Sequence, residues 1–188
     1  NFVRYGMKDA ATWAIDYDAL RRTALETKPK IILAWFSAYP RELDYTKFAE
    51  IAAEVGAVAM ADMAHIAGFI AAWLLKNPLD AGFQMMTTTT HKSMRWPRGA
   101  MILTKWIVGN PLKAPEKTID NLPTLVDRAV FPGIQWGPHM QTIAAIAVAL
   151  GEANTQAFKD YAKQTLVNAK VLAHELLTYT KKDKCIVY

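Results

Sequence analysis

Cysteine is almost absent from this sequence, since Cys185 is the only cysteine among 188 residues. A lone thiol excludes an intrachain disulfide and a metal site built from several cysteines. We therefore expect no metal and a reducing, cytoplasmic compartment. The sequence also lacks a signal-peptide pattern and any apolar run long enough to span a bilayer, so we expect no contact with a membrane.

A strong excess of one charge is also missing. Lysine and arginine number 22 against 17 for aspartate and glutamate, which gives a net charge of +5. The basic residues are scattered, so the pattern does not indicate a nucleic-acid partner. Hydrophobic residues make up 52% of the chain, enough for one domain with a packed core. The chain begins without methionine and residues 184–188 read as a cut strand, so we expect a piece of a longer protein.

Strand-like runs alternate with amphipathic, helix-like stretches along the chain. We expect strands at residues 30–34, 57–61, 83–88 and 100–104. We expect helices at residues 16–27, 44–56, 64–73, 138–153 and 156–179. Residues 1–15 read as an extended segment, and the signals over 107–128 are weak and loop-like. This alternation predicts an α/β fold with a largely parallel sheet, in which ligands bind beyond the carboxyl ends of the strands.

Local signals add detail to these elements. Asp16 and Asp44 are expected to cap the first two helices at their N-termini, and Gly56 is expected to end the second. The continuous apolar run at 30–34 is typical of a strand buried on both faces. The inner face of the first helix is predicted to consist of Leu20, Ala24 and Leu25.

The most informative stretch is residues 87–99, TTTTHKSMRWPRG, which places Lys92 just after an expected strand. Partial desolvation at such a strand end favours the neutral amine, which can attack an aldehyde and form a Schiff base. The alternative is a surface loop whose lysine is solvated. Lys92 by itself does not decide between the two.

A carboxylate, Asp62, stands at the end of the preceding apolar strand. It is costly there unless a cation meets it, or unless it caps the following helix. An amine and an anion at neighbouring strand ends point to pyridoxal phosphate above other cofactors. Its aldehyde takes an amine, and its ring nitrogen takes an anionic partner.

Four motifs together resemble the serine hydroxymethyltransferase family. They are residues 37–41 (SAYPR), 62–68 (DMAHIAG), 87–92 (TTTTHK) and 131–138 (FPGIQWGP), and they occur in the family's order. The resemblance covers essentially the whole chain. It implies part of a fold type I large domain, with a mostly parallel sheet flanked by helices. It also implies a pyridoxal-phosphate-dependent transferase that interconverts serine and glycine, with tetrahydrofolate as one-carbon carrier.

The resemblance also implies roles for individual residues. Lys92 would bind the cofactor covalently, and Asp62 would pair with its ring nitrogen. The ring-hydroxyl side of the cofactor would be contacted by Ser37 and His65. Thr89 and His91 would lie beside the reacting lysine, and Arg98 would belong to the lysine loop and help to shape the site. Backbone N–H groups around Trp136 and Gly137 would bind the phosphate of a neighbouring subunit's cofactor, which implies a homodimer with shared active sites.

Other interpretations of the same residues stay open. His65 is also compatible with a core histidine, the threonines with a β-rich strand end, and Arg98 with a surface ion pair. At the level of function, the alternatives are a threonine or allo-threonine aldolase on the same fold and a degenerate paralogue without activity.

The family pattern assigns residues 1–153 to the large domain and residues 154–188 to a connecting helix and the start of a small domain. The family's amino-terminal phosphate loop and its carboxy-terminal domain lie outside these residues. We therefore predict that the 188-residue chain alone is inactive.

Six tryptophans depart from the family pattern, because each stands where the family has or accepts glycine. They are Trp13, Trp35, Trp73, Trp96, Trp106 and Trp136. Glycine at such turns permits a positive φ or a close backbone approach, which an indole does not. We interpret the six as UGA codons that the source organism reads as glycine. The alternative is that they belong to a degenerate, inactive protein.

Overall fold

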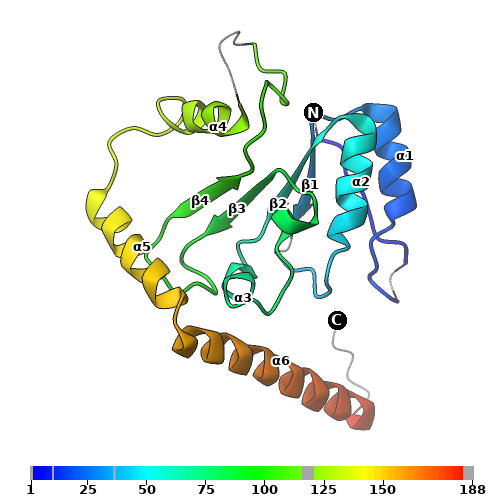
Figure 1. Ribbon diagram of the computed structural model, residues 1–188. Helices are drawn as coiled ribbons and strands as arrows, with labels where there is room; N and C mark the ends of the chain where they lie inside the picture. The colour runs from blue at the N-terminus through cyan, green and yellow to red at the C-terminus, as the bar shows by residue number, and fades with distance from the viewer. Residues whose placement is uncertain (1, 10, 36, 116–120, 184–188) are drawn as a thin grey trace.

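The computed structural model describes residues 2–9, 11–35, 37–115 and 121–183 of the chain (Figure 1). The strands are β1 (Ile31–Trp35), β2 (Val58–Asp62), β3 (Met85–Thr89) and β4 (Ala100–Thr104). The helices are α1 (Tyr17–Thr27), α2 (Tyr45–Val55), α3 (Ala67–Ala71), α4 (Leu122–Val130), α5 (Met140–Ala153) and α6 (Gln156–Asp183), with a 3-10 turn η1 (Pro78–Ala81). The strand-like residues 184–188 lie outside the described part.

The four strands form one sheet in the order β1-β2-β3-β4. The first three are parallel, and β4 runs antiparallel to β3. The antiparallel pair follows from the short connection between β3 and β4, since a parallel crossover needs a dozen or more residues. The predicted α/β class with a largely parallel sheet is confirmed.

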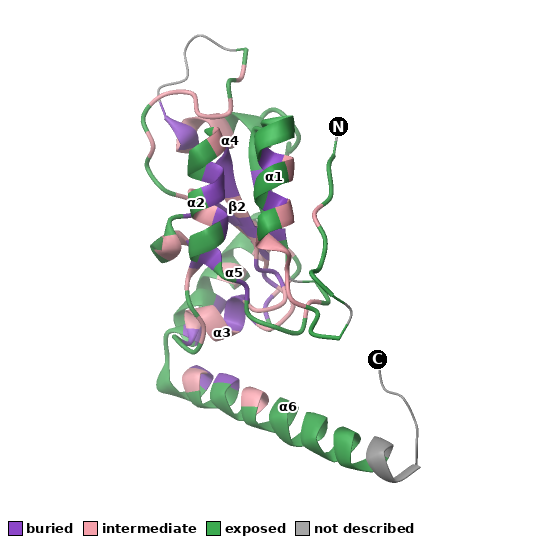
Figure 2. Cartoon of the chain, turned by 90° about the vertical axis from the view of Figure 1, so that its right-hand side faces the viewer, coloured by how far each residue is buried: buried purple, intermediate pink, exposed green. Residues whose placement is uncertain are grey.

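Helices α1 and α2 cover one face of the sheet (Figure 2). A bidentate ion pair joins them, with Arg21 Nη2 and Glu54 Oε1 2.6 Å apart. The predicted caps are confirmed: Asp16 accepts a hydrogen bond from Ala19 N, Asp44 accepts one from Lys47 N, and Gly56 ends α2 in the left-handed region. The core between helices and sheet contains Leu20, Ala24, Phe48, Ile51, Ala59 and Phe83.

Two predictions about burial were wrong. Leu25 is exposed, because it lies outside the i, i+4 row of Leu20 and Ala24 on α1. β1 is buried on one face only: Ile31, Leu33 and Trp35 are exposed. The reason is that β1 is an edge strand whose second face has no helix against it in the described structure.

The predicted loop at 107–128 was also wrong in part, because α4 begins at Leu122. The Asn121 side chain accepts a hydrogen bond from Thr124 N, and Pro123 lies in the first turn. Both are helix-start signals that the weak apolar pattern of the segment concealed. The expected helix at 64–73 is shorter than predicted, since only Ala67–Ala71 are helical.

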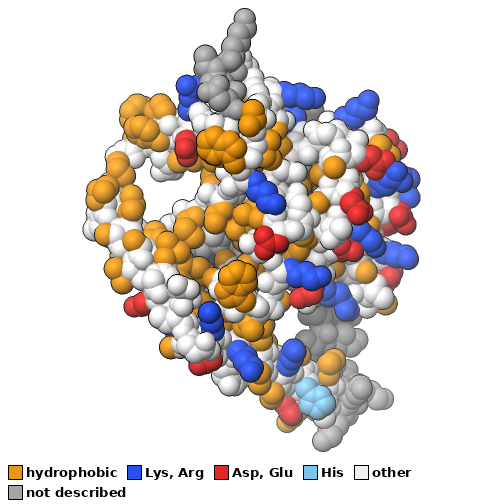
Figure 3. Space-filling view, in the orientation of Figure 1, with side chains coloured by type: hydrophobic (Ala, Val, Ile, Leu, Met, Phe, Trp, Pro, Cys, Tyr) orange, Lys and Arg blue, Asp and Glu red, His pale blue; other side chains and the backbone are white. Residues whose placement is uncertain are grey.

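A second, smaller core lies where α5 meets α6. Buried members of it include Ala149 and Ala153 on α5, Phe158 and Ala162 on α6, and Trp96 from the loop after β3. Beyond this contact most of α6 is exposed, whereas charged side chains gather over α1 and α2 (Figures 2 and 3).

Candidate functional site

The carboxyl ends of β1, β2 and β3 meet at one edge of the sheet. Trp35 pairs in register with Asp62, and Asp62 pairs with Thr87. Paired residues share a face, and residues two apart on a strand do too, so Asp62, Thr87 and Thr89 lie on the face opposite α1 and α2. That face carries the polar groups of the candidate site.

The carboxylate of Asp62 does not cap a helix. Its Oδ1 accepts a hydrogen bond from Ala64 N at 3.0 Å, within the turn that follows β2. The N-cap of α3 is Ile66, which makes no capping bond with its side chain. Among the described residues no ion pair includes Asp62. The helix-cap interpretation is therefore wrong, and the carboxylate is left for another partner.

The four threonines alternate in their roles. Thr88 and Thr90 are buried, and their hydroxyls donate to backbone carbonyls of Thr89 and Pro97. Thr90 N donates to Gly99 O, and Trp96 N donates to Thr90 O, so Thr90 closes the base of the lysine loop. Within the described residues, the buried atoms Thr89 Oγ1 and His91 Nδ1 have no hydrogen-bond partner. Unpaired buried polar atoms are uncommon, and two of them next to Lys92 in the sequence fit a site that a polar ligand completes.

The lysine loop, residues 90–99, lies directly against the segment that begins at Asp62. Ser93 Oγ accepts a hydrogen bond from Gly68 N at 3.0 Å. A β-carbon at position 68 would come within 2.6 Å of Ser93 O, so only glycine allows this approach. Arg95 N donates to Lys92 O at 2.9 Å and closes the turn around the lysine. Asp62 and Lys92 therefore belong to two segments that pack on each other.

The other predicted site residues lie in the turns and loops between the helices and strands. His65 is half-buried in the turn after β2, whereas Ser37 and Arg98 are exposed in the loops after β1 and before β4. No ion pair includes Arg98 in the described part of the chain. Trp136 and Gly137 are exposed between α4 and α5, and the Trp136 ring packs edge-on against Phe131. Among the described residues, no hydrogen bond or ring contact joins that turn to the lysine loop.

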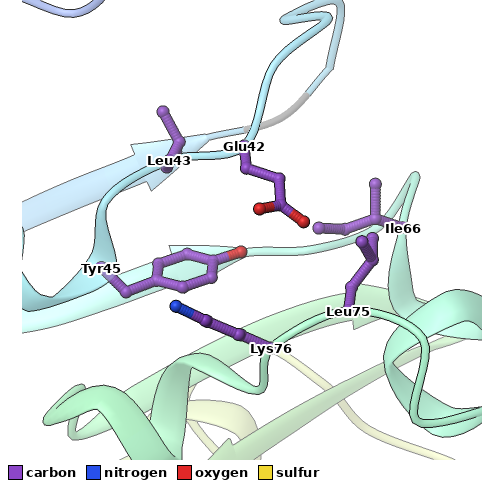
Figure 4. Close-up of a pocket in the computed structure, with 6 residues that line it drawn as sticks. All are labelled: Glu42, Leu43, Tyr45, Ile66, Leu75 and Lys76. Carbon is purple, nitrogen blue, oxygen red and sulfur yellow. The ribbon is translucent and has the colours of Figure 1, made fainter.

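A small pocket lies elsewhere. It measures about 20 Å³ and is lined by Glu42, Leu43, Tyr45, Ile66, Leu75 and Lys76 (Figure 4). Burial raises the pKa of the Tyr45 hydroxyl above its usual range. The space suits about one water molecule and none of the predicted site residues lines it. The pocket is therefore separate from the candidate site.

Contacts between residues that lie far apart in the sequence were not predicted. Ser93 with Gly68, and Arg95 with the rings of Phe158 and Tyr161, join residues that no local pattern relates. Of these residues, only Gly68 lies in one of the four motifs, and no sequence signal pointed to Phe158 or Tyr161.

A comparison with protein families decides the identity. The family model described as serine hydroxymethyltransferase matches residues 1–183. The chain belongs to the serine hydroxymethyltransferase family. The resemblance drawn from the four motifs is confirmed, and the sheet with its flanking helices is consistent with part of the family's fold type I domain. In the described residues, no helix has both the length and the apolar character needed to cross a membrane.

The polar groups of the Asp62 segment and the lysine loop fit the cofactor on which serine hydroxymethyltransferases in general depend, pyridoxal phosphate. Lys92 offers an amine and Asp62 offers a carboxylate without an ion-pair partner among the described residues. Thr89 Oγ1 and His91 Nδ1 are polar atoms that lack a partner. This set matches a ligand with an aldehyde, a basic ring nitrogen and further polar substituents.

Proposed function

We propose that this chain carries the lysine-bearing part of an enzyme that interconverts serine and glycine, with tetrahydrofolate as one-carbon carrier. The observation that supports the proposal most is the packing of the Asp62 segment against the Lys92 loop, through Gly68 N and Ser93 Oγ. Pyridoxal phosphate, when bound, would withdraw electrons from the substrate's α-carbon.

Each residue has a distinct part in this proposal. Lys92 would hold the cofactor covalently through its Nζ. Asp62 keeps a proton on the ring nitrogen by providing the counter-charge. Ser37 and His65 orient the ring through its hydroxyl side.

The remaining residues act around the lysine and across a subunit boundary. Thr89 and His91 would help the substrate's amino group to replace that of Lys92 on the cofactor. Arg98 would help to shape the lysine loop. Trp136 and Gly137 offer backbone N–H groups to the phosphate of a neighbouring subunit's cofactor, so the proposed assembly is a homodimer. Residues 1–153 belong to the large domain and residues 154–188 lead out of it.

The test uses the protein expressed from its complete reading frame, incubated with pyridoxal phosphate and reduced with borohydride. We expect peptide mapping to find the label on Lys92, and Lys92→Ala to abolish it. Lys105→Ala, an exposed lysine after β4, is the matched control and should leave labelling unchanged. Labelling elsewhere, or none in the wild-type protein, would refute the proposal.

Serine cleavage then separates the two enzyme candidates. The transferase requires tetrahydrofolate for efficient cleavage of serine, whereas an aldolase cleaves a β-hydroxy amino acid without it. We expect folate dependence in the complete protein and no measurable cleavage by the 188-residue chain alone.

A further inference from the structure

The outer side of the lysine loop rests on the first turns of α6. The Arg95 guanidinium carbon lies 4.0 Å from the centre of the Tyr161 ring and 5.4 Å from that of Phe158. A guanidinium at this distance from an aromatic ring is attracted to it, and its planar shape allows stacking that an ammonium cannot match. Arg95 is therefore a link between a loop of the sheet and a helix more than sixty residues away, as the residue numbers show.

The backbone at Arg95 connects this contact to the turn that holds Lys92. Its φ of 60° lies in the left-handed region, and its N–H donates to Lys92 O. The residues on either side, Met94 and Trp96, are buried in the α5–α6 core beside Phe158. Three consecutive residues thus attach the loop to α6, and the middle one is hydrogen-bonded to the lysine itself.

We propose that Arg95 is a positioning residue for Lys92, which acts by fixing the lysine turn to Tyr161 and Phe158 on α6. This inference rests on the proposed function of Lys92. The position of α6 would set the orientation of the lysine, so that movement of the helix changes how the cofactor is held.

The experiment compares ring removal with ring retention in the complete protein. Tyr161→Leu removes the aromatic face, and Tyr161→Phe, the matched control, retains it. We expect Tyr161→Leu and Arg95→Met to raise the dissociation constant of pyridoxal phosphate roughly threefold and to shift the pH midpoint of the bound cofactor's absorbance. Tyr161→Phe should behave as wild type, and Arg95→Lys should fall between.

Two outcomes overturn the proposed positioning role of Arg95. One is a Tyr161→Leu protein whose cofactor affinity and absorbance midpoint equal those of wild type. The other is the absence of coupling between Arg95→Met and Tyr161→Leu in a double-mutant cycle of thermal midpoints, which needs no cofactor. If wild-type protein carries no label on Lys92 while the cycle shows coupling, the contact stands but the positioning role and the proposed function fail together.

A different observation carries a second inference, which concerns the tryptophans. Tryptophan is among the more buried residues of most proteins, yet here most indoles face solvent. The exposed fractions are 42% for Trp13, 59% for Trp35, 80% for Trp73, 73% for Trp106 and 72% for Trp136, against 7% for Trp96.

Two of these tryptophans adopt a backbone conformation suited to glycine. Trp13 has a φ of 57° and Trp73 a φ of 62°. In the described residues, the other non-glycine residues with positive φ are Lys28, Arg95 and Lys113. Two of six tryptophans therefore share a conformation that bulky residues rarely adopt.

Trp73 occupies the position where helices most often place glycine. After α3, Trp73 N donates to Ile70 O and Leu74 N donates to Phe69 O. This pair of bonds is the Schellman motif, whose left-handed residue is usually glycine. The same two bonds end α2, from Gly56 N to Ala53 O and from Ala57 N to Ala52 O, and there the left-handed residue is Gly56.

We infer that glycine stands at positions 13 and 73 in the native polypeptide, where UGA codons are decoded as glycine. At positions 35, 106 and 136 the indoles are exposed, which is consistent with the same change. At position 96 the indole is buried in the α5–α6 core, where it helps to attach the lysine loop, and nothing there favours glycine. Positions 13 and 73 therefore carry the inference.

The decisive measurement pairs the gene's codons with peptide masses of the protein isolated from its native cells. We expect UGA codons at positions 13 and 73 and peptides with glycine there. UGG codons, or peptides that contain the indole, would overturn the inference.

A stability comparison tests the physical basis separately. In the tryptophan-bearing protein, we expect Trp73→Gly to raise the thermal midpoint by about 2 °C, since it relieves the left-handed strain. Trp35→Gly, in strand β1, is the control and should not raise it. A lower midpoint for Trp73→Gly would contradict the argument from backbone strain.

Discussion

Thr89 has a hydroxyl oxygen that is buried and has no hydrogen-bond partner among the described residues, which is costly in the absence of a ligand. We predict that Thr89→Val stabilises the cofactor-free protein by about 1 kcal/mol, because a methyl group replaces an unpaired polar atom. The same change should weaken pyridoxal phosphate binding about tenfold, because the hydroxyl is then missing from the ligand's side. Chemical denaturation and a cofactor titration measure the two effects.

Thr88 provides the matched control for that prediction. Its hydroxyl is also buried, but it donates to Thr89 O at 2.9 Å. Thr88→Val should therefore destabilise the cofactor-free protein by about 1 kcal/mol and leave the ligand's contacts in place. If both valine variants lose stability equally, the Thr89 hydroxyl has a partner and our interpretation is wrong.

Sequence motifs point to Lys92 and Asp62 as candidates, because a lysine and a carboxylate after neighbouring apolar strands suggest a cofactor site. They did not reveal which threonine hydroxyl lacks a partner. That depends on contacts such as Thr90 Oγ1 to Pro97 O, which form only when the loop folds back on the strand.

Helix α3 and the lysine loop are held together at Gly68, which is the contact most sensitive to a small change. We predict that Gly68→Ala destabilises the protein by about 1–3 kcal/mol, since the new methyl group would press on Ser93 O at 2.6 Å and the backbone would have to move. The displaced loop should also bind pyridoxal phosphate more weakly. Denaturant unfolding and cofactor titration test both expectations.

Gly151 is the matched control because it lies inside α5 and an added β-carbon there meets nothing within 4 Å. Gly151→Ala should stabilise the protein by about 0.5–1 kcal/mol through helix propensity. Equal effects of the two alanines would show that the close approach of Gly68 to Ser93 does not matter.

Element boundaries followed from the sequence where a cap marks them. Asp16, Asp44 and Gly56 make the predicted capping contacts because capping depends on neighbouring residues only. The exposed face of β1 and the start of α4 at Leu122 were missed. The first depends on which faces of the sheet helices cover, and the second on a short cap signal within a segment of weak periodicity.

The whole chain exposes more surface than a compact protein of its size. Its accessible area is 12793 Å² for 21.0 kDa, whereas a compact monomer of that mass exposes about 9,000 Å². Exposed apolar side chains contribute to this excess along α5 and α6, as Figure 3 shows for α5. On α6 one row at spacings of four and three residues consists of Leu172, Leu176 and Tyr179.

We predict that this surface makes the chain self-associate, in line with the proposed homodimer. Sedimentation velocity should give a mass about twice that of one chain at micromolar concentration, because the excess area exceeds what a standard interface buries. Leu172→Lys places a charge in the apolar row and should raise the dimer dissociation constant at least about tenfold. Lys170→Ala, an exposed polar position on the same helix, should not. A monomer at all concentrations would show that α6 does not mediate self-association, and that other contacts must cover its apolar row.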